Sequence, residues 1–257
     1  MSSPRQLEAL VSTSAPPAHA ASLGFWTSLL VSLLAVTAFA FGITTPPRSG
    51  PYCLSGPCIA YPYTNAAQYV PRDYYWVAPA LLLLPAFLVV AHCLHTVVPA
   101  EKKHLSSIAL NFTSIAAALI ALDYFLQFQI DEPSLLKNET AGLSLFTQYN
   151  PHGFFIALED LGYLTLCLAF LFLSPAVPRT VRAAQAIRWT LLIAGSLGLA
   201  TFAEMTWHYG LNIDYRFEVA VITIIWTTSL ILGIECAVFF RSMRIGAPNP
   251  PATAQAG

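Results

Sequence analysis

Apolar residues along this chain are gathered into long runs, and short polar segments separate one run from the next. A helix that crosses a bilayer needs about 20 mostly apolar residues, at a rise of about 1.5 Å per residue. Six runs meet this requirement, and each connecting segment carries proline, glycine or charged residues that do not belong in hydrocarbon. The predicted spans are residues 23–44, 75–98, 105–130, 154–173, 189–207 and 219–239.

This pattern predicts an all-α integral membrane protein, a single six-span bundle that covers residues 23–244. The ends, residues 1–22 and 245–257, are rich in Ala, Pro and Ser and are predicted to be disordered tails. The first run has a second interpretation as a cleaved signal peptide, because Ala38-Phe39-Ala40 fits the cleavage-site pattern. No Lys or Arg adjoins that run, which weighs against cleavage; if it is cleaved, five spans remain and the N-terminus lies outside.

The distribution of Lys and Arg predicts the orientation, because these residues concentrate in cytoplasmic segments. The segments that flank the spans fall into two alternating sets, one for each side of the membrane. One set holds eight Lys and Arg residues and the other holds four, and both termini belong to the richer set. Both termini are therefore predicted to be cytoplasmic. The richer set is Arg5, Lys102, Lys103, Arg179, Arg182, Arg188, Arg241 and Arg244, and the other is Arg48, Arg72, Lys137 and Arg216.

Composition agrees with lipid as the solvent for much of the surface. Hydrophobic residues make up 56% of the chain and charged residues 10%, with a mean hydropathy of +0.61. Soluble proteins carry about 25% charged residues. The net charge of −1 lacks the basic excess that nucleic-acid binding requires. Because the chain is so poor in charged residues, membrane lipids are the expected partners. The oligomeric state is not indicated.

The cysteines fall into two groups. Cys53 and Cys58 flank Leu-Ser-Gly-Pro in the first connecting segment, which the charge count places outside. An oxidising environment favours a disulfide between them, and two free thiols are the alternative. The remaining cysteines lie within predicted spans and are expected to be small core residues: Cys93, Cys167 and Cys236.

Acidic residues inside three consecutive spans are the main functional signal. An ionisable residue in a spanning helix costs about 2.5–3.5 kcal/mol on insertion scales, so each one needs a reason. Asp123, Glu159 and Glu204 lie at a similar depth, roughly 7–9 Å from the bilayer centre toward the outer face. Each has a polar residue one turn further along the same helical face. The sequence predicts one shared cavity, with the ligand-binding residues Asp123, Gln127, Glu159, Asp160, Tyr163, Glu204 and His208.

Two weaker interpretations apply to the buried polar groups. Protonated carboxyl groups can join neighbouring helices by hydrogen bonds worth about 0.6–2 kcal/mol each, without any ligand. On the cytoplasmic side, His92 or His95 of the second span is expected to bond to Glu235 of the sixth.

Three segments, residues 123–127, 148–153 and 157–163, resemble a group of uncharacterised bacterial multi-pass membrane proteins of about six spans. The likeness runs from about residue 61 to about residue 172, and it implies a bacterial cytoplasmic (inner) membrane without implying a function. The scattered intramembrane acids also give a looser likeness to the emopamil-binding type of sterol isomerase and its relatives. In those proteins, membrane carboxylates line a lipid-accessible cavity.

Three functions remain open at this point. The leading one is binding or transport of a small amphiphile or cation, for which carboxylates supply counter-charge and aromatic side chains supply walls. The second is an intramembrane enzyme that acts on a lipid by carboxylate acid/base chemistry. The third is a structural or assembly protein without a small ligand. No cofactor and no metal are predicted, since the layer holds one good nitrogen ligand, His208, and the chain has no H-E-x-x-H spacing.

Overall fold

The computed structural model describes residues 18–54, 56–179 and 181–246, and within these ranges it is helical without any strand. Six helices are long and apolar enough to cross a membrane, which confirms the predicted all-α six-span bundle. The spanning helices are α2 (Ala18–Thr44), α3 (Val77–Val97), α4 (Lys103–Leu126), α6 (Phe154–Leu173), α7 (Arg182–Tyr209) and α8 (Tyr215–Gly246), and α5 (Glu132–Lys137) is a short additional helix.

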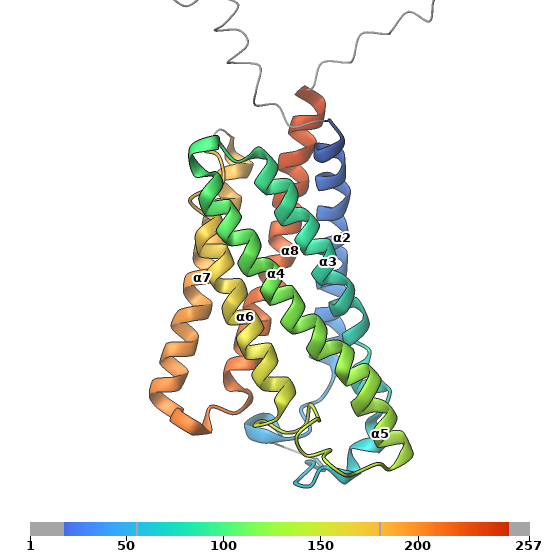
Figure 1. Ribbon diagram of the computed structural model, residues 1–257. Coiled ribbons are helices and arrows are strands. Elements are labelled where there is room, and N and C mark those ends of the chain that lie inside the picture. Colours follow the sequence, from blue (N-terminus) through green and yellow to red (C-terminus); the bar gives the residue numbers. More distant parts are fainter. Residues whose placement is uncertain (1–17, 55, 180, 247–257) are drawn as a thin grey trace, which may run out of the picture.

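The helices follow one another around the bundle in chain order. Helix α3 contacts α2 and α4, helix α6 contacts α4 and α7, and α8 closes the ring by contacting both α7 and α2. Helix α2 begins and α8 ends at the same end of the bundle, here called the terminal end (Figure 1). The opposite end is called the disulfide end, because the predicted Cys53–Cys58 disulfide is present there. Which end is cytoplasmic stays a prediction.

Small residues allow two pairs of helices to approach closely. A Cβ atom at Gly233 of α8 would lie 2.2 Å from the Ser32 hydroxyl oxygen of α2, and that hydroxyl donates to the Leu230 carbonyl at 3.0 Å. A Cβ atom at Gly162 of α6 would lie 2.5 Å from the Ile120 side chain of α4. Lipid offers no hydrophobic drive for helix association, so such close backbone contacts carry much of the packing energy.

Several helices extend beyond the predicted spans. Helix α2 begins at Ala18, so residues 18–22 of the predicted N-terminal tail are helical, while residues 1–17 and 247–257 lie outside the described part. The third span continues past residue 130 through a π-helical turn, Gln127–Asp131, into α5. Asp131 does not end the helix, because its carboxyl group is buried and accepts a hydrogen bond from the Tyr74 hydroxyl at 2.6 Å.

Candidate functional site

A cavity of about 350 Å³ lies at the disulfide end between α2, α8 and the segment after α2. This volume falls within the range of small-molecule sites, about 300–1,000 Å³. Ile43, Val219 and Thr223 line the cavity and are also exposed, so it opens at the side of the bundle between α2 and α8. We call it the lateral cavity. Its aromatic lining residues are Phe39, Tyr52, Trp76, Tyr149, Tyr215 and Trp226.

Two of the three charged residues in the lining of the lateral cavity neutralise each other. The Arg48 guanidinium donates from Nε and Nη2 to the two Asp73 carboxylate oxygens, at 2.9 and 3.2 Å. This hydrogen bonding raises the pKa of Arg48. The Tyr149 hydroxyl also donates to Asp73, at 3.3 Å; burial, and then the nearby carboxylate, raises the pKa of Tyr149 and keeps its proton in place. The third charged residue, Glu218, has no oppositely charged partner in the part of the chain that the structure describes.

Glu218, in the first turn of α8, belongs to a group of acidic residues contributed by three helices. The Glu159 carboxyl group of α6 is one of its electrostatic neighbours. Asp123 of α4 and Asp160 of α6 are close enough to repel these two electrostatically. We call Asp123, Glu159, Asp160 and Glu218 the carboxyl cluster. Within the described residues, no Lys, Arg or His side chain forms an ion pair with any of the four.

The carboxyl cluster keeps unused acceptor atoms, although two of its members are buried and the other two are partly buried. The exposed fraction of Glu159 is 2% and that of Asp123 is 0%. Gln127 donates from Nε2 to both Asp123 oxygens at 3.3 Å, which is the predicted contact one turn along the helix. A buried polar atom without a partner costs about 1–3 kcal/mol. Among the described residues the atoms without a protein partner include Gln127 Oε1, Glu159 Oε1, Asp160 Oδ1 and Glu218 Oε2.

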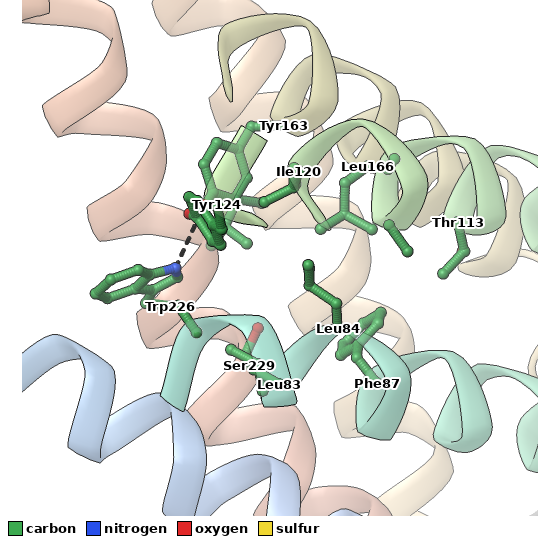
Figure 2. A pocket seen from close by; sticks show the side chains of 14 residues that line it. Leu83, Leu84, Phe87, Thr113, Ile120, Tyr124, Tyr163, Leu166, Trp226 and Ser229 are labelled. Carbon is green, nitrogen blue, oxygen red and sulfur yellow. Dashed lines mark hydrogen bonds between the residues drawn. The ribbon is translucent and has the colours of Figure 1, made fainter. Parts of the chain in front are cut away.

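Hydrogen bonds join Trp226, Tyr163 and Tyr124 in a chain (Figure 2). The Trp226 indole Nε1 donates to the Tyr163 hydroxyl at 3.0 Å, and that hydroxyl lies 2.7 Å from the Tyr124 hydroxyl. An indole N–H only donates, so Trp226 is the donor of its bond, whereas either tyrosine hydroxyl can donate to the other. The Glu159 carboxyl group is an electrostatic neighbour of both tyrosines.

Trp226, Tyr124 and Tyr163 also line a second, smaller cavity of about 30 Å³. Figure 2 shows these three side chains gathered at one side of it, while Leu84 and Phe87 lie on another. The volume is enough for about one or two water molecules, and the lining is mostly apolar. Trp226 therefore forms part of the wall of both cavities.

The structure brings five of the seven predicted ligand-binding residues together and separates the other two. Asp123, Gln127, Glu159, Asp160 and Tyr163 belong to the carboxyl cluster or touch it. Glu204 and His208 instead pair with each other, Oε1 to Nε2 at 3.3 Å, and their side chains are 58% and 61% exposed.

The expectation that Glu204 shares one cavity with Asp123 and Glu159 is therefore corrected. The buried face of α7 ends at Gly198, and Glu204 is six residues further on. Six residues correspond to a rotation of roughly 240° around a helix, at about 100° per residue. Glu204 has the depth of the cluster but faces away from the bundle.

Sequence reasoning missed Glu218, the residue that joins the carboxyl cluster to the lateral cavity. Its place beside the polar segment after α7 assigned it to a loop, but α8 begins three residues earlier, at Tyr215. The pattern of apolar residues along α8 could have indicated that Glu218 faces the bundle. Glu218 lies at spacings of three and four residues from a buried row on α8 that continues through Val221, Ile225, Ser229 and Leu232.

The polar residues near the terminal end pair differently from the prediction. His95 Nδ1 lies 2.7 Å from the Ser106 hydroxyl of α4. Glu235 accepts a hydrogen bond from the Thr190 hydroxyl of α7 at 3.0 Å. The predicted bond between a histidine of α3 and Glu235 is thus replaced by two bonds to hydroxyl groups, since α7 and not α3 supplies the partner of Glu235.

Within the described ranges, no group of three or more His, Cys, Asp or Glu side chains is placed to hold a metal ion. The buried thiols Cys93, Cys167 and Cys236 are free, as expected for core residues. Comparison of the chain with protein-family models, with curated proteins and with solved structures finds no match. The two resemblances noted in the sequence therefore stay predictions.

Proposed function

We propose that this integral membrane protein binds a small amphiphilic cation in the lateral cavity, with Glu218 as its counter-charge. One observation carries the proposal. Glu218 is the charged residue of the cavity lining that has no oppositely charged partner within the described residues, since Arg48 and Asp73 are paired with each other. A cation in the cavity would supply the charge that the carboxyl cluster lacks.

The lining of the cavity supports an amphiphile rather than a hydrated inorganic ion. Trp76 and Trp226 offer aromatic faces, which attract organic cations by about 0.5–2 kcal/mol each. Ile43 and Val219 at the opening are apolar and belong to spanning helices, so an apolar tail would pass between α2 and α8 into the lipid. The same first step, binding from the membrane, would serve transport of the cation.

Direct binding to the full-length protein tests the proposal. The protein is placed in nanodiscs of phosphatidylcholine, and radiolabelled tetraphenylphosphonium, a permanently charged lipophilic cation, is added by equilibrium dialysis. We expect saturable binding that the neutral analogue triphenylphosphine oxide does not compete away. Binding that is not saturable, or that the neutral analogue competes away equally well, would contradict the proposal and favour a structural or assembly role.

A matched pair of substitutions locates the site. Glu218→Gln should weaken tetraphenylphosphonium binding at least about tenfold, which is about 1.4 kcal/mol. Glu204→Gln removes a carboxyl group from the same end of the bundle but outside the cavity, and it should leave binding within about twofold. Equal affinities in the two variants would move the site away from Glu218. Elution of both variants as monodisperse peaks in size-exclusion chromatography controls for folding.

We further propose that the disulfide end faces outward and both termini lie in the cytoplasm, on the basis of the Lys and Arg distribution. Single cysteines at Ser134 and Ala183, in a background without the native cysteines, are exposed to an impermeant maleimide on intact cells. Ser134, near the disulfide end, should be labelled and Ala183 should be protected. Labelling of Ala183 with protection of Ser134 would indicate the opposite orientation, with the lateral cavity in the inner leaflet.

A further inference from the structure

The basic residues at the terminal end of the bundle have no acidic partner among the described residues. The ion pairs that the described ranges contain all lie at the disulfide end. Glu101, an acidic residue beside Lys102, takes part in none of them. A charge next to hydrocarbon is costly without a counter-charge, so these residues call for a partner of another kind. They are Lys102, Lys103, Arg179, Arg182, Arg188, Arg241 and Arg244.

Two of these basic residues bond to the same atom. Lys102, in the segment between α3 and α4, donates from Nζ to the Pro175 carbonyl oxygen at 2.9 Å. Arg188 of α7 donates from Nη1 to the same oxygen at 3.2 Å and to the Val177 carbonyl oxygen at 3.0 Å. The two cationic groups are therefore held close together, although they repel each other. Both residues are half-buried, and carbonyl oxygens carry only partial charges, which offset part of two full charges.

The start of α7 adds further donors to this part of the bundle. The first N–H groups of a helix have no partner within it, and the helix N-terminus favours negative charge. Helix α7 has the apolar Val181 at its N-cap and no acidic residue in its first turn, which begins with Arg182. The other N–H donors of Lys102 and Arg188 also lack an acceptor among the described residues. Positive charge without counter-charge is thus gathered between the start of α4, the end of α6 and the start of α7 (Figure 1).

We propose that Lys102, Arg182 and Arg188, here called the basic site, bind the phosphate group of an anionic phospholipid. The oxygen atoms of a phosphate diester only accept hydrogen bonds, and Arg and Lys are the side chains that bind phosphate in proteins. Net negative charge distinguishes this ligand from a zwitterionic lipid, whose ammonium group would be repelled by the same residues. The basic site lies at the opposite end of the bundle from the lateral cavity, so the inference does not depend on the proposed cation site.

The surroundings of the basic site favour a lipid over a soluble phosphate ester. Trp189, the residue after Arg188, is 64% exposed, and Ile193, one turn further, is 60% exposed. Tryptophan is enriched at membrane–water interfaces, so Trp189 marks the level of the headgroups beside the basic site. The exposed apolar surface of α7 beyond it would lie along the acyl chains. The predicted orientation also places this end in the cytoplasmic leaflet, where anionic lipids attract basic segments.

Native mass spectrometry of the full-length protein tests the proposal, because it resolves single lipid molecules bound to one chain. The delipidated protein in a neutral detergent is titrated with phosphatidylglycerol and, separately, with phosphatidylcholine. The first phosphatidylglycerol should bind at least about fivefold more tightly than the first phosphatidylcholine, which is the gain for one basic residue beside an anionic lipid. Equal affinities for the two lipids would overturn the proposal. So would a series of phosphatidylglycerol molecules that all bind equally well, since a diffuse charge would then attract them.

A soluble headgroup separates a lipid from a free phosphate ester. Glycerophosphoglycerol carries the headgroup of phosphatidylglycerol without its acyl chains. At a concentration equal to that of the lipid it should not displace the bound phosphatidylglycerol, because it lacks the contact with the apolar surface of α7. Displacement would show that the site takes soluble phosphate esters and would overturn the assignment to a lipid. These measurements use the unsubstituted protein, so they do not depend on whether a variant folds.

A matched pair of substitutions assigns the binding to the basic site. Arg188→Gln should weaken the binding of the first phosphatidylglycerol at least about fivefold and leave the affinity for phosphatidylcholine unchanged. Arg244→Gln removes a basic residue from the same end of the bundle, where Arg244 lies 5.0 Å above the Phe25 ring of α2. Because separated surface charges are screened by salt, this control should keep the affinity within about twofold. Equal losses in the two variants would overturn the assignment.

Discussion

The carboxyl cluster and the Glu204–His208 pair lie near the same end of the bundle and are built from similar residues, but their surroundings are opposite. Asp123 and Glu159 are buried where α4, α6 and α8 meet, and neither forms an ion pair with any basic residue of the described ranges. Glu204 has a basic partner 3.3 Å away, and both side chains are more than half exposed.

The difference between the two groups follows from which face of each helix is covered. The buried row of α4 passes through Ala116, Ile120 and Asp123, and that of α6 passes through Glu159, Tyr163 and Phe170. Each carboxyl group lies on the row that its neighbours cover. On α7 the fully buried residues end at Gly198. Beyond it Phe202 and Met205 still contact the bundle, and Glu204 lies on another face of the helix. The comparison teaches that equal depth in the membrane does not imply a common site.

Chemical labelling should give the largest contrast between the two regions. In a background without native cysteines, Glu204→Cys should react with a membrane-permeable maleimide, because its side chain is 58% exposed. Glu159→Cys should react at least about a hundredfold more slowly, since a site that is 2% exposed is reached only through local opening of the bundle. Mass spectrometry of the intact protein over time gives both rates. Similar rates would mean that the cluster is open to the membrane and would break the comparison.

A smaller effect is expected on stability when the hydrogen bonds between Trp226, Tyr163 and Tyr124 are broken. Tyr163→Phe leaves the Trp226 N–H without an acceptor and removes the hydroxyl that bonds to Tyr124, so it should lower the free energy of unfolding by about 1–2 kcal/mol. The matched control is Trp207→Phe, at a side chain that is 87% exposed, and it should change stability by less than about 0.5 kcal/mol. Thermal unfolding in one detergent, followed by circular dichroism, measures both. Equal losses would show that the chain contributes no more than surface contacts do.

The smallest effect should come from the exposed pair itself. His208→Gln removes the partner of Glu204, but ion pairs at exposed helix positions contribute only about 0–1 kcal/mol. We therefore expect a change in unfolding temperature close to the error of measurement, together with unchanged tetraphenylphosphonium binding. A large loss of stability would indicate that another copy of the chain or a partner covers this face of α7 in the membrane.

The sequence by itself determined the parts of this protein that depend on the membrane as a solvent. Six apolar runs predicted six spanning helices, because backbone groups in hydrocarbon must be paired within each helix. Depth along a helix also follows from counting residues, so the level shared by Asp123 and Glu159 was predictable. The predicted outer location of Cys53 and Cys58, together with their close spacing, favoured a disulfide between them, which the structure confirms.

Only the tertiary structure decided which polar residues meet. A buried face is defined by the neighbour that covers it, and the pattern within one helix cannot reveal which neighbour that is or where its contact ends. For this reason Glu204 was placed in the site and Glu218 was left out of it. Glu218 gains its position because α8 closes the ring against α2 and brings its first turn to α6 and to the segment after α2. The lateral cavity, with Glu218 in its lining, forms because the ring closes in this way.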